Sequence, residues 1–408
     1  MMKILQLNCV FKKGSTGKIV FDLHRQYQAL GHESYVIYGR GQKENVSSVY
    51  KCAYELPSKC RNFLARFTGN LYGSGKLATY KIIRCIRKIQ PDIVHVHCLN
   101  GFCADLYKLL QFLRNENIAT VITQHAEFMY TGNCGYAFEC DQWKRQGCQQ
   151  CANTLAAIGS YNHNAPAKNF RKMKQAFCGF DDNLTIAGVS NWVSGRAAES
   201  LILKGKKITT VLNGLDDSVF SYKEITHPIV EKYHKQNKKV VLHVTPLFED
   251  DNKGGKYVLA LAESLENEPI QIIVVGKTQK EYALENITFW GHTANADELA
   301  NLYSSADLCL LTSKKETFSM VCAESLCCGT RIVGFCAGAP ETIALPEYSR
   351  FVTYGDIELL KDTVLQTLKQ EVDKKTISQQ ACRVYSYKEM AKNYLDVYED
   401  LQQRMGKR

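Results

Sequence analysis

The stretch KLATYKIIRCIRKIQPDIVHVH, residues 76–97, decides the fold class of this chain. Its first part, residues 76–90, carries apolar side chains at helical spacing and stops at Pro91, which cannot continue a helix. Residues 92–97 follow as a short apolar run typical of a buried strand. A helix leading directly into a buried strand is half of a crossover unit, so the stretch predicts a parallel sheet.

The same alternation continues on both sides of this stretch. Towards the N-terminus we expect a strand at 4–7, a turn at 14–17, a helix at 19–30 and a strand at 34–38. Towards the C-terminus we expect a helix at 105–116 and a strand at 120–123. These elements predict an α/β domain over residues 1–215, with ligands at the carboxyl ends of its strands.

The pattern restarts in the second half of the chain. Polar residues 216–238 look like a linker, and residues 239–386 again alternate between strand and helix patterns. The expected strands start at 240, 270, 287, 308 and 331. We therefore predict two Rossmann-like parallel-sheet domains. The last segment, 387–408, reads as an amphipathic helix that returns to the N-terminal domain, with apolar residues at Met390, Tyr394, Val397 and Leu401.

Length and composition indicate a folded protein of about two to three domains and exclude several classes of protein. Of its 408 residues, 45% are hydrophobic and 23% are charged, which excludes a disordered chain. No run of about 18 apolar residues predicts a membrane-spanning helix. The first residues lack the pattern of a signal peptide, so we expect a cytoplasmic protein. Most of the 17 cysteines are scattered in apolar segments, as buried thiols are in reducing compartments.

Positive charge is concentrated in the first half. Residues 1–215 hold 28 Lys and Arg against 13 Asp and Glu, a net charge of +15, and the rest of the chain has a net charge of −5. Lys81, Arg84 and Lys88 share one predicted helix face, with aromatic residues nearby. This distribution favours peripheral contact with an anionic membrane at its inner face, and nucleic acid is the competing partner.

The segment ETFSMVCAE, from Glu316 to Glu324, places two carboxylates around the start of a predicted helix. A helix N-terminus has unpaired N–H groups and a positive dipole end, which suit a phosphate. Glu324 lies about two turns into the helix, where it can bond ribose hydroxyls. Two solvated glutamates would show the same spacing, so the residues alone leave both interpretations open.

This segment resembles the E-x7-E segment of retaining glycosyltransferases with the GT-B fold, most of all family 4. Other segments agree with that family in order along the chain: GSTG at 14–17, PDIVHVH at 91–97, TQH at 123–125, VLNGLD at 211–216 and KG at 253–254. The resemblance spans nearly the whole chain. It implies two domains facing across a cleft and transfer of a sugar from a nucleotide-sugar donor with retention.

The resemblance also implies roles for individual residues. Lys253 would contact the donor diphosphate, Glu324 the ribose, and Glu316 the transferred sugar. His125 would lie by that sugar, and Glu316 and His125 are the expected catalytic residues. Backbone groups would complete the donor site; they belong to Gly14, Gly17, Phe318, Ser319 and Met320. No cofactor is expected. The acceptor would be a saccharide or a polyprenyl-diphosphate-linked saccharide.

Two positions depart from the family pattern. Relatives commonly have an arginine beside the leaving phosphates, but residues 244–253 contain none. Phosphate binding is therefore expected to depend on Lys253 and on backbone groups. The residue after His125 is Ala126, where many relatives have aspartate, so a His–Asp pair is not expected.

Four cysteines cluster at Cys134, Cys140, Cys148 and Cys151, after His125. Four thiolates can hold a structural zinc ion, and free thiols or disulfides are the alternatives. This loop, with Thr131 and Trp143, resembles family members that assemble bacterial capsule, exopolysaccharide or O-antigen.

Two other functions remain open from the sequence. A sugar-nucleotide 2-epimerase uses the same fold and needs no acceptor. A zinc-containing nucleic-acid-binding protein would account for the basic half and the cysteines, but it would leave the second domain without a purpose.

Overall fold

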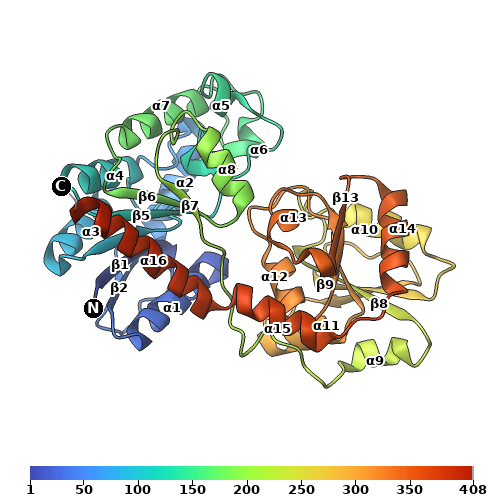
Figure 1. Ribbon diagram of the computed structural model, residues 1–408. Helices are drawn as coiled ribbons and strands as arrows, with labels where there is room; N and C mark the ends of the chain where they lie inside the picture. The colour runs from blue at the N-terminus through green and yellow to red at the C-terminus, as the bar shows by residue number, and fades with distance from the viewer. Residues whose placement is uncertain (407–408) are drawn as a thin grey trace. The chain divides into compact units, whose positions relative to one another are not determined.

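The computed structural model describes residues 1–406, which form two compact units (Figure 1). Unit 1 contains Met1–Leu212 and the segment from Met390 onward, and unit 2 contains Asn213–Glu389. Residues 216–238, predicted as a linker, therefore lie within unit 2, where they include helix α9 (Pro228–His234). No helix among the described residues is both long enough and apolar enough to cross a membrane.

Unit 1 contains a parallel sheet, as the strand and helix patterns predict. Register fixes its centre: Ile4 pairs with Ser34 on one side and with Ile93 on the other. The described strands, in their order across the sheet, are β3 (Val49–Lys51), β2 (Glu33–Arg40), β1 (Lys3–Val10), β4 (Ile93–Val96), β5 (Thr120–Gln124), β6 (Leu184–Gly188) and β7 (Ile208–Thr210). Both faces of such a sheet are covered, which explains the continuous apolar runs of its strands.

Helices connect these strands. They are α1 (Gly14–Ala29), α2 (Glu55–Thr68), α3 (Lys76–Ile89), α4 (Leu106–Asn115), α5 (Gln142–Arg145), α6 (Thr154–Ile158), α7 (Ala165–Phe177) and α8 (Asn191–Glu199). The expectation of a turn at residues 14–17 was wrong, because these residues form the first turn of α1. Gly17 lies against β1: a Cβ added there would meet Val10 Cγ2 at 3.1 Å, so a larger residue would separate helix from strand.

The C-terminal helix α16 (Tyr387–Gly406) packs on the sheet of unit 1, as predicted. Its anchor is Tyr398, whose hydroxyl lies 2.7 Å from His95 Nδ1 and 2.9 Å from the Tyr27 hydroxyl. Tyr394 bonds Thr123 Oγ1 at 2.8 Å. Val397, predicted on the apolar face, is only half-buried. The helix is therefore attached through a buried polar network as well as through apolar area.

Unit 2 contains a second parallel sheet. Its described strands, in order across the sheet, are β10 (Ile287–Gly291), β9 (Ile270–Lys277), β8 (Lys239–Leu247), β11 (Leu308–Leu311), β12 (Ile332–Phe335) and β13 (Ser349–Val352). Its further helices are α10 (Gly255–Ser264), α11 (Ala296–Ser305), α12 (Met320–Cys327), α13 (Pro340–Ile343), α14 (Ile357–Leu368) and α15 (Lys374–Tyr385).

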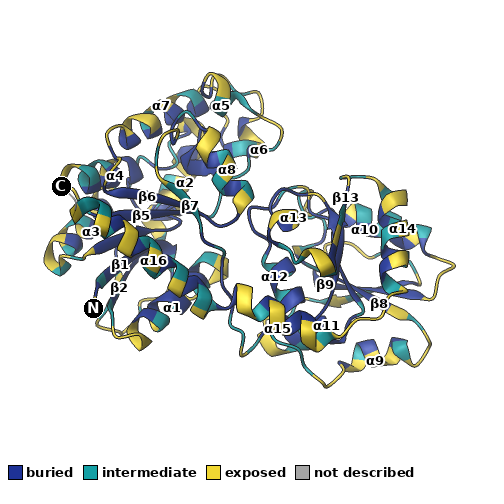
Figure 2. Cartoon of the chain, viewed as in Figure 1, coloured by how far each residue is buried: buried dark blue, intermediate teal, exposed yellow. Residues whose placement is uncertain are grey.

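The strands form the buried centre of each unit, and the helices expose their outer faces (Figure 2). In unit 2, Val241, Ile272 and Leu310 are completely buried in neighbouring strands. Phe248 extends this core beyond the end of β8. The sheet is thus a rigid platform, and the loops at its carboxyl edge carry the side chains considered next.

Candidate active site

Two predicted site residues follow neighbouring strands of unit 2. Lys253 comes after β8, and Glu316 comes after β11, which is hydrogen-bonded to β8. Because the strands are parallel, both loops leave from the same edge of the sheet. The fold therefore brings together two residues that are 63 positions apart in the sequence.

Lys253 and Glu316 form an ion pair. Lys253 Nζ lies 2.6 Å from Glu316 Oε1, and the two side chains are 26% and 11% exposed. Gly254 makes the close approach of this loop feasible, since its φ is +72° and an added Cβ would meet Thr312 O at 2.2 Å. The result is a partly accessible ammonium group held against a mostly buried carboxylate.

Asn252, which the sequence reasoning missed, fixes the two loops together. Its side-chain Nδ2 donates to Lys315 O at 3.0 Å, and its Oδ1 accepts from Lys315 N at 3.1 Å. The backbone N–H of Lys314 donates to Asn252 O at 2.7 Å. The sequence signal that could have indicated Asn252 is its position directly before Lys253 and Gly254. Asn252 thereby sets the distance between Lys253 and Glu316.

The backbone of Glu316 is held by a third loop, which follows β12. Glu316 N donates to Ala337 O at 2.9 Å, and Ala339 N donates to Glu316 O at 3.2 Å. That loop is in turn held by Glu341, which accepts from Ala337 N at 3.0 Å and from Gly338 N at 2.7 Å. Glu316 thus has a fixed backbone and a side chain committed to Lys253.

Helix α12 begins at this edge with an unusual cap. Ser319 has φ +77°, uncommon for a residue with a Cβ, and its Oγ accepts from Cys322 N at 3.3 Å. Such strain is typical of functional turns. Phe318 is buried, with its ring centroid 6.4 Å from that of Tyr385, and Met320 is half-buried. The positive end of the α12 dipole lies at Met320, four residues after Glu316 in the chain.

Glu324 lies one turn further along α12 than Met320. Its Oε2 accepts from the Tyr303 hydroxyl at 3.1 Å. Tyr303 is completely buried, and burial together with the nearby Glu324 charge raises its pKa well above the ordinary value. The tyrosine therefore stays a donor and orients the carboxylate. No local sequence pattern points to Tyr303, which comes from α11.

His125 follows β5 at the carboxyl edge of the unit 1 sheet. Its Nε2 lies 3.2 Å from Nδ1 of the buried His97, whose Nε2 lies 3.2 Å from Gln6 Oε1. Gln6 donates its amide N–H to Val20 O, so its oxygen accepts from His97 Nε2. Burial lowers the pKa of His97 well below normal and that of His125 to about 4. The chain of bonds thus assigns the Nε2–H tautomer to a neutral His125.

The glycine segment lies at the same edge of unit 1, after β1. Asn8 closes that end of the strand, because its Oδ1 accepts from Cys98 N at 3.0 Å and its Nδ2 donates to Val10 O at 2.8 Å. Gly14 has φ +65° and open space where a Cβ would be, whereas Gly17 is enclosed. Of the two glycines, only Gly14 leaves room for another molecule.

Comparisons with known proteins agree with this arrangement. Residues 16–219 match the family described as Glycosyltransferase Family 4, and residues 238–370 match the family described as Glycosyl transferases group 1. This chain belongs to glycosyltransferase family 4. Among curated relatives, the transferase is 23% identical over 384 residues to N-acetyl-alpha-D-glucosaminyl L-malate synthase of Bacillus anthracis, covering 90% of this chain and 87% of that protein.

Solved structures show that the transferase has the GT-B fold. Sucrose-phosphate synthase from Thermosynechococcus elongatus superposes with a TM-score of 0.67 at 15% identity, covering 99% of this chain and 100% of the other. Anabaena HepE in complex with UDP superposes with a TM-score of 0.64 at 16% identity, covering 98% and 100% of the two chains.

The four-cysteine loop of the transferase shows no metal site among the residues that the structure describes. Within residues 1–406, no group of three or more His, Cys, Asp or Glu side chains is arranged to hold a metal ion. Cys134, Cys140, Cys148 and Cys151 are free thiols. Burial raises the pKa of Cys148 to about 12 and that of Cys134 further. The zinc and disulfide alternatives are therefore not supported.

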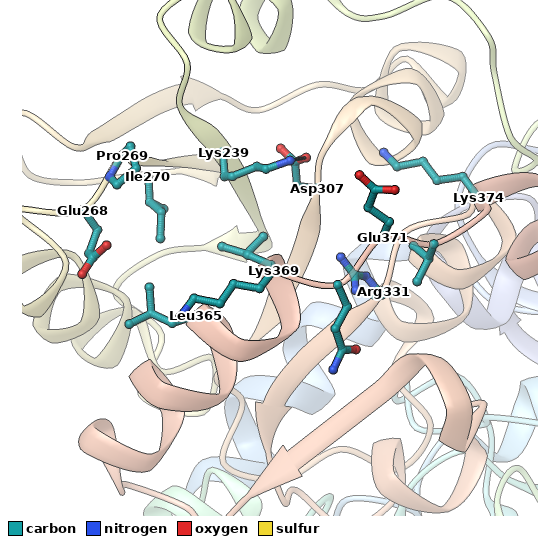
Figure 3. A pocket seen from close by; sticks show the side chains of 13 residues that line it. Lys239, Glu268, Pro269, Ile270, Asp307, Arg331, Leu365, Lys369, Glu371 and Lys374 are labelled. Carbon is teal, nitrogen blue, oxygen red and sulfur yellow. Dashed lines mark hydrogen bonds and ion pairs between the residues drawn. The ribbon is translucent and has the colours of Figure 1, made fainter.

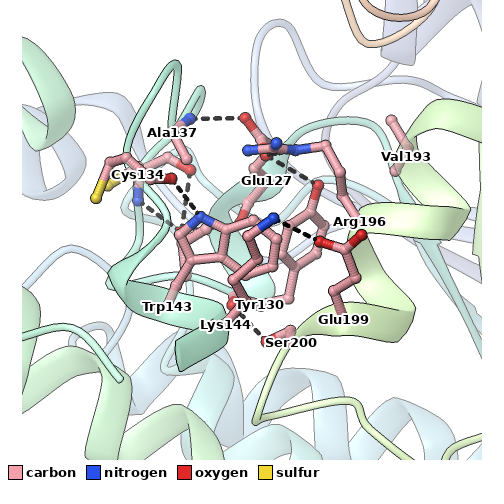
Figure 4. A network of polar contacts seen from close by, with 12 residues as sticks. Glu127, Tyr130, Cys134, Ala137, Trp143, Lys144, Val193, Arg196, Glu199 and Ser200 are labelled. Carbon is pink, nitrogen blue, oxygen red and sulfur yellow. Dashed lines mark hydrogen bonds and ion pairs between the residues drawn. The ribbon is translucent and has the colours of Figure 1, made fainter. Parts of the chain in front are cut away.

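A buried polar network stabilises this loop instead (Figure 4). Glu127 Oε1 lies 2.6 Å from Arg196 Nε, and its Oε2 accepts from Ala137 N at 2.6 Å. Trp143 donates its indole N–H to Cys140 O at 2.8 Å and packs under the Arg196 guanidinium at 4.9 Å. The chain segments on either side of the cysteines are thus tied to α8.

The structure shows what surrounds the two positions at which the transferase departs from the family pattern. Arg331 cannot replace the missing arginine, because it precedes β12 and so lies at the opposite edge of the sheet from Lys253. Ala126 offers no carboxylate to His125, and the next residue, Glu127, is engaged by Arg196. Lys253, which pairs with Glu316, remains the proposed cation for the diphosphate at the carboxyl edge of unit 2.

Proposed function

We propose that this glycosyltransferase moves a sugar from a nucleotide-sugar donor to a saccharide or lipid-linked saccharide acceptor, with retention at the anomeric carbon. The observation that carries the proposal is the Lys253–Glu316 pair beside the N-terminus of α12. A compact ammonium group and a helix N-terminus are both suited to a diphosphate.

The donor occupies the carboxyl edge of unit 2. Lys253 contacts the diphosphate, with backbone N–H groups of Phe318, Ser319 and Met320. Glu324, oriented by Tyr303, accepts from ribose hydroxyls. Anabaena HepE, which is similar in fold, has been crystallised with UDP-glucose, which supports a nucleotide-sugar donor.

Glu316 and His125 are assigned to the transferred sugar. When a diphosphate oxygen replaces the Glu316 carboxylate as the partner of Lys253, that carboxylate can accept a hydrogen bond from a sugar hydroxyl. Neutral His125 accepts a hydrogen bond from a sugar hydroxyl, and Gly14 and Gly17 shape the backbone that follows β1 in unit 1. The bond from the anomeric carbon to the diphosphate oxygen breaks as the acceptor oxygen bonds on the same face. The acceptor proton passes to the leaving phosphate, whose charge Lys253 and the N-terminus of α12 stabilise, and no protein nucleophile takes part.

Unit 1 carries a surface suited to an anionic membrane, where a polyprenyl-diphosphate-linked acceptor would lie. Four large apolar side chains of α2 are exposed by more than half: Leu56, Phe63, Leu64 and Phe67. The neighbouring α3 exposes the predicted basic face of Lys81, Arg84 and Lys88. Lys81 Nζ lies 4.8 Å from the Tyr54 ring centroid, next to the start of α2. Exposed apolar and basic side chains together favour binding in a membrane interface.

The acceptor class is tied to capsule, exopolysaccharide or O-antigen assembly through the resemblance of the loop at 131–151. The Bacillus anthracis relative is named for a small acceptor, L-malate. The exposed surface of α2 and α3 favours the lipid-linked acceptor, because a small soluble acceptor requires no such surface. No nucleic-acid partner is proposed.

A donor screen followed by transfer assays tests the proposal. Sugar conjugates of UDP, GDP, ADP and CDP are compared by thermal shift, since a ligand of the native state raises its melting temperature. With the best donor, Glu324→Gln and Lys253→Ala should each abolish most transfer while the circular dichroism spectrum is retained. Near-normal turnover in both variants would contradict the assignment. Donor isomerisation without any acceptor would indicate a 2-epimerase instead.

A further inference from the structure

Unit 2 has a pocket at the amino edge of its sheet (Figure 3). This edge lies opposite the one that carries Lys253. Its volume is about 640 Å³. It is lined by the start of β8 at Lys239, by Arg331 before β12, and by the segment from the end of α14 to the start of α15. None of these residues belongs to the proposed donor site.

Arg331 is the unusual residue of this pocket. The side chain is only 6% exposed, yet its Nε and Nη1 atoms have no hydrogen-bond partner. Burial lowers the pKa of Arg331, although the charge of Asp307 opposes that effect. An unsatisfied buried guanidinium is costly, and native proteins rarely retain one without a partner. Because Arg331 lines the pocket, a ligand that reaches these N–H groups from the pocket would satisfy them.

Two further cations share the pocket wall with Arg331. Lys374 Nζ donates to Ser304 O at 2.8 Å and to Ala306 O at 2.6 Å, which leaves one of its three protons for another acceptor. Lys369 lines the same pocket and is exposed. All three cationic side chains line the same pocket, and a phosphate group offers several acceptor oxygens for such donors.

The carboxylates around the pocket leave this positive charge available. Asp307 is already engaged, because it accepts from Val240 N and His234 Nε2 at 2.8 Å each and pairs with Lys239 at 3.3 Å. Glu268 lies at the other end of the pocket from Arg331 (Figure 3). Glu371 is exposed and forms no hydrogen bond with the unpartnered Arg331 atoms.

The other end of the pocket has the apolar side chains of Pro269, Ile270 and Leu365 on its wall, next to Glu268 (Figure 3). We propose that this pocket binds a phosphate monoester, with the phosphate on Arg331, Lys374 and Lys369 and the organic part on the apolar wall. The site is separate from the donor site, so the proposal does not depend on the proposed function.

Calorimetry of the full chain with phenyl phosphate and inorganic phosphate tests the proposal. Phenyl phosphate should bind at least about threefold tighter, because its ring covers apolar wall. Arg331→Gln should weaken phenyl phosphate binding by about tenfold or more. Lys369→Ala, at an exposed position, should weaken it by about threefold, and Glu371→Gln should tighten it. The Lys369 and Glu371 variants keep the test valid if the Arg331 variant fails to fold.

Two matched variants separate this pocket from the donor site. Lys361→Ala removes a lysine of α14 that does not line the pocket. Lys253→Ala disables the proposed donor site. Both variants should bind phenyl phosphate as the wild type does. Loss of binding in Lys253→Ala, with binding retained in Arg331→Gln, would overturn the proposal. Equal affinities for phenyl phosphate and inorganic phosphate would overturn it as well.

Discussion

Lys253 Nζ and Glu316 Oε1 are 2.6 Å apart, so the ammonium group assigned to the donor diphosphate is paired with the carboxylate assigned to the donor sugar. Each group therefore has a partner when no donor is bound. A diphosphate carries more charge than a carboxylate and competes for Lys253. Donor binding thus exchanges one ion pair for another and releases Glu316 at the same time.

This exchange predicts different effects for the two residues. Glu316→Gln removes the competing carboxylate, so the nucleoside diphosphate should bind as tightly as in wild type or tighter, while transfer falls by about 10²-fold. Lys253→Met should weaken diphosphate binding and transfer together. Calorimetry with the nucleoside diphosphate and initial rates with the donor measure the two quantities.

Lys256→Met is the matched control, since Lys256 is an exposed lysine at the start of α10, three positions after Lys253. It should leave binding and rate within about twofold of wild type, as expected for an exposed side chain. Weaker diphosphate binding in Glu316→Gln would show that the carboxylate does not compete for Lys253.

Buried neutral histidines predict acid sensitivity. Burial lowers the pKa of His24 to about 4, against 6.5 for an ordinary histidine. Between pH 6.5 and 4 the unfolded chain binds a proton that the folded chain does not, so the free energy of unfolding falls as the pH falls. His24 alone should account for about 2 kcal/mol lost between pH 7 and 5.

His24→Gln should therefore flatten the pH dependence of stability in chemical denaturation measured at pH 7 and at pH 5. His292→Gln, which changes an exposed histidine, should leave the slope as in wild type. The same slope in His24→Gln and wild type would show that His24 is protonated in the folded protein.

The α/β class and the two sheets were predictable because buried parallel strands leave apolar runs that need no long-range information. Strands β3, β6, β7 and β13 were not predicted. Each has only three to five residues, and such short strands leave little periodic signal. The turn expected at 14–17 failed because glycines, which favour turns, here open a helix that must lie close to β1.

The site was only partly predictable. Lys253, Glu316 and Glu324 were proposed as site residues through the family resemblance, because their spacing alone is ordinary. Tyr303 orients Glu324, and Asn252 joins the loops that carry Lys253 and Glu316. These contacts join residues that are far apart in the sequence, so no local pattern indicates them. The zinc site predicted from the cysteine cluster is not supported, and the contact that holds this loop is again distant in sequence, because Glu127 pairs with a residue on α8 that is 69 positions away.

The attachment of α16 predicts a stability loss for Tyr398→Phe. The change leaves His95 Nδ1 and the Tyr27 hydroxyl without their shared partner inside the protein. An unsatisfied buried polar group costs about 1–3 kcal/mol. Tyr387→Phe, on the same helix, is the control, because Tyr387 is half-buried and its change should cost under about 0.5 kcal/mol. Equal midpoints in urea for the two variants would contradict the anchoring role of Tyr398.

The Glu127–Arg196 pair predicts the largest single effect on unit 1. Glu127 is 1% exposed and Arg196 is 18% exposed, so removing either partner leaves a charge with little access to water. Glu127→Gln and Arg196→Met should each cost about 3 kcal/mol or more, and the double variant should cost less than their sum.

The pair Lys144–Glu199 is the matched control: its side chains are 33% and 54% exposed, so breaking it should cost under about 1 kcal/mol. Denaturation followed by tryptophan fluorescence measures both pairs, because the Trp143 and Trp192 ring centroids lie 4.9 Å and 4.8 Å from the Arg196 guanidinium. Strictly additive losses at Glu127 and Arg196 would mean that the loop over the cysteines is stabilised by other contacts.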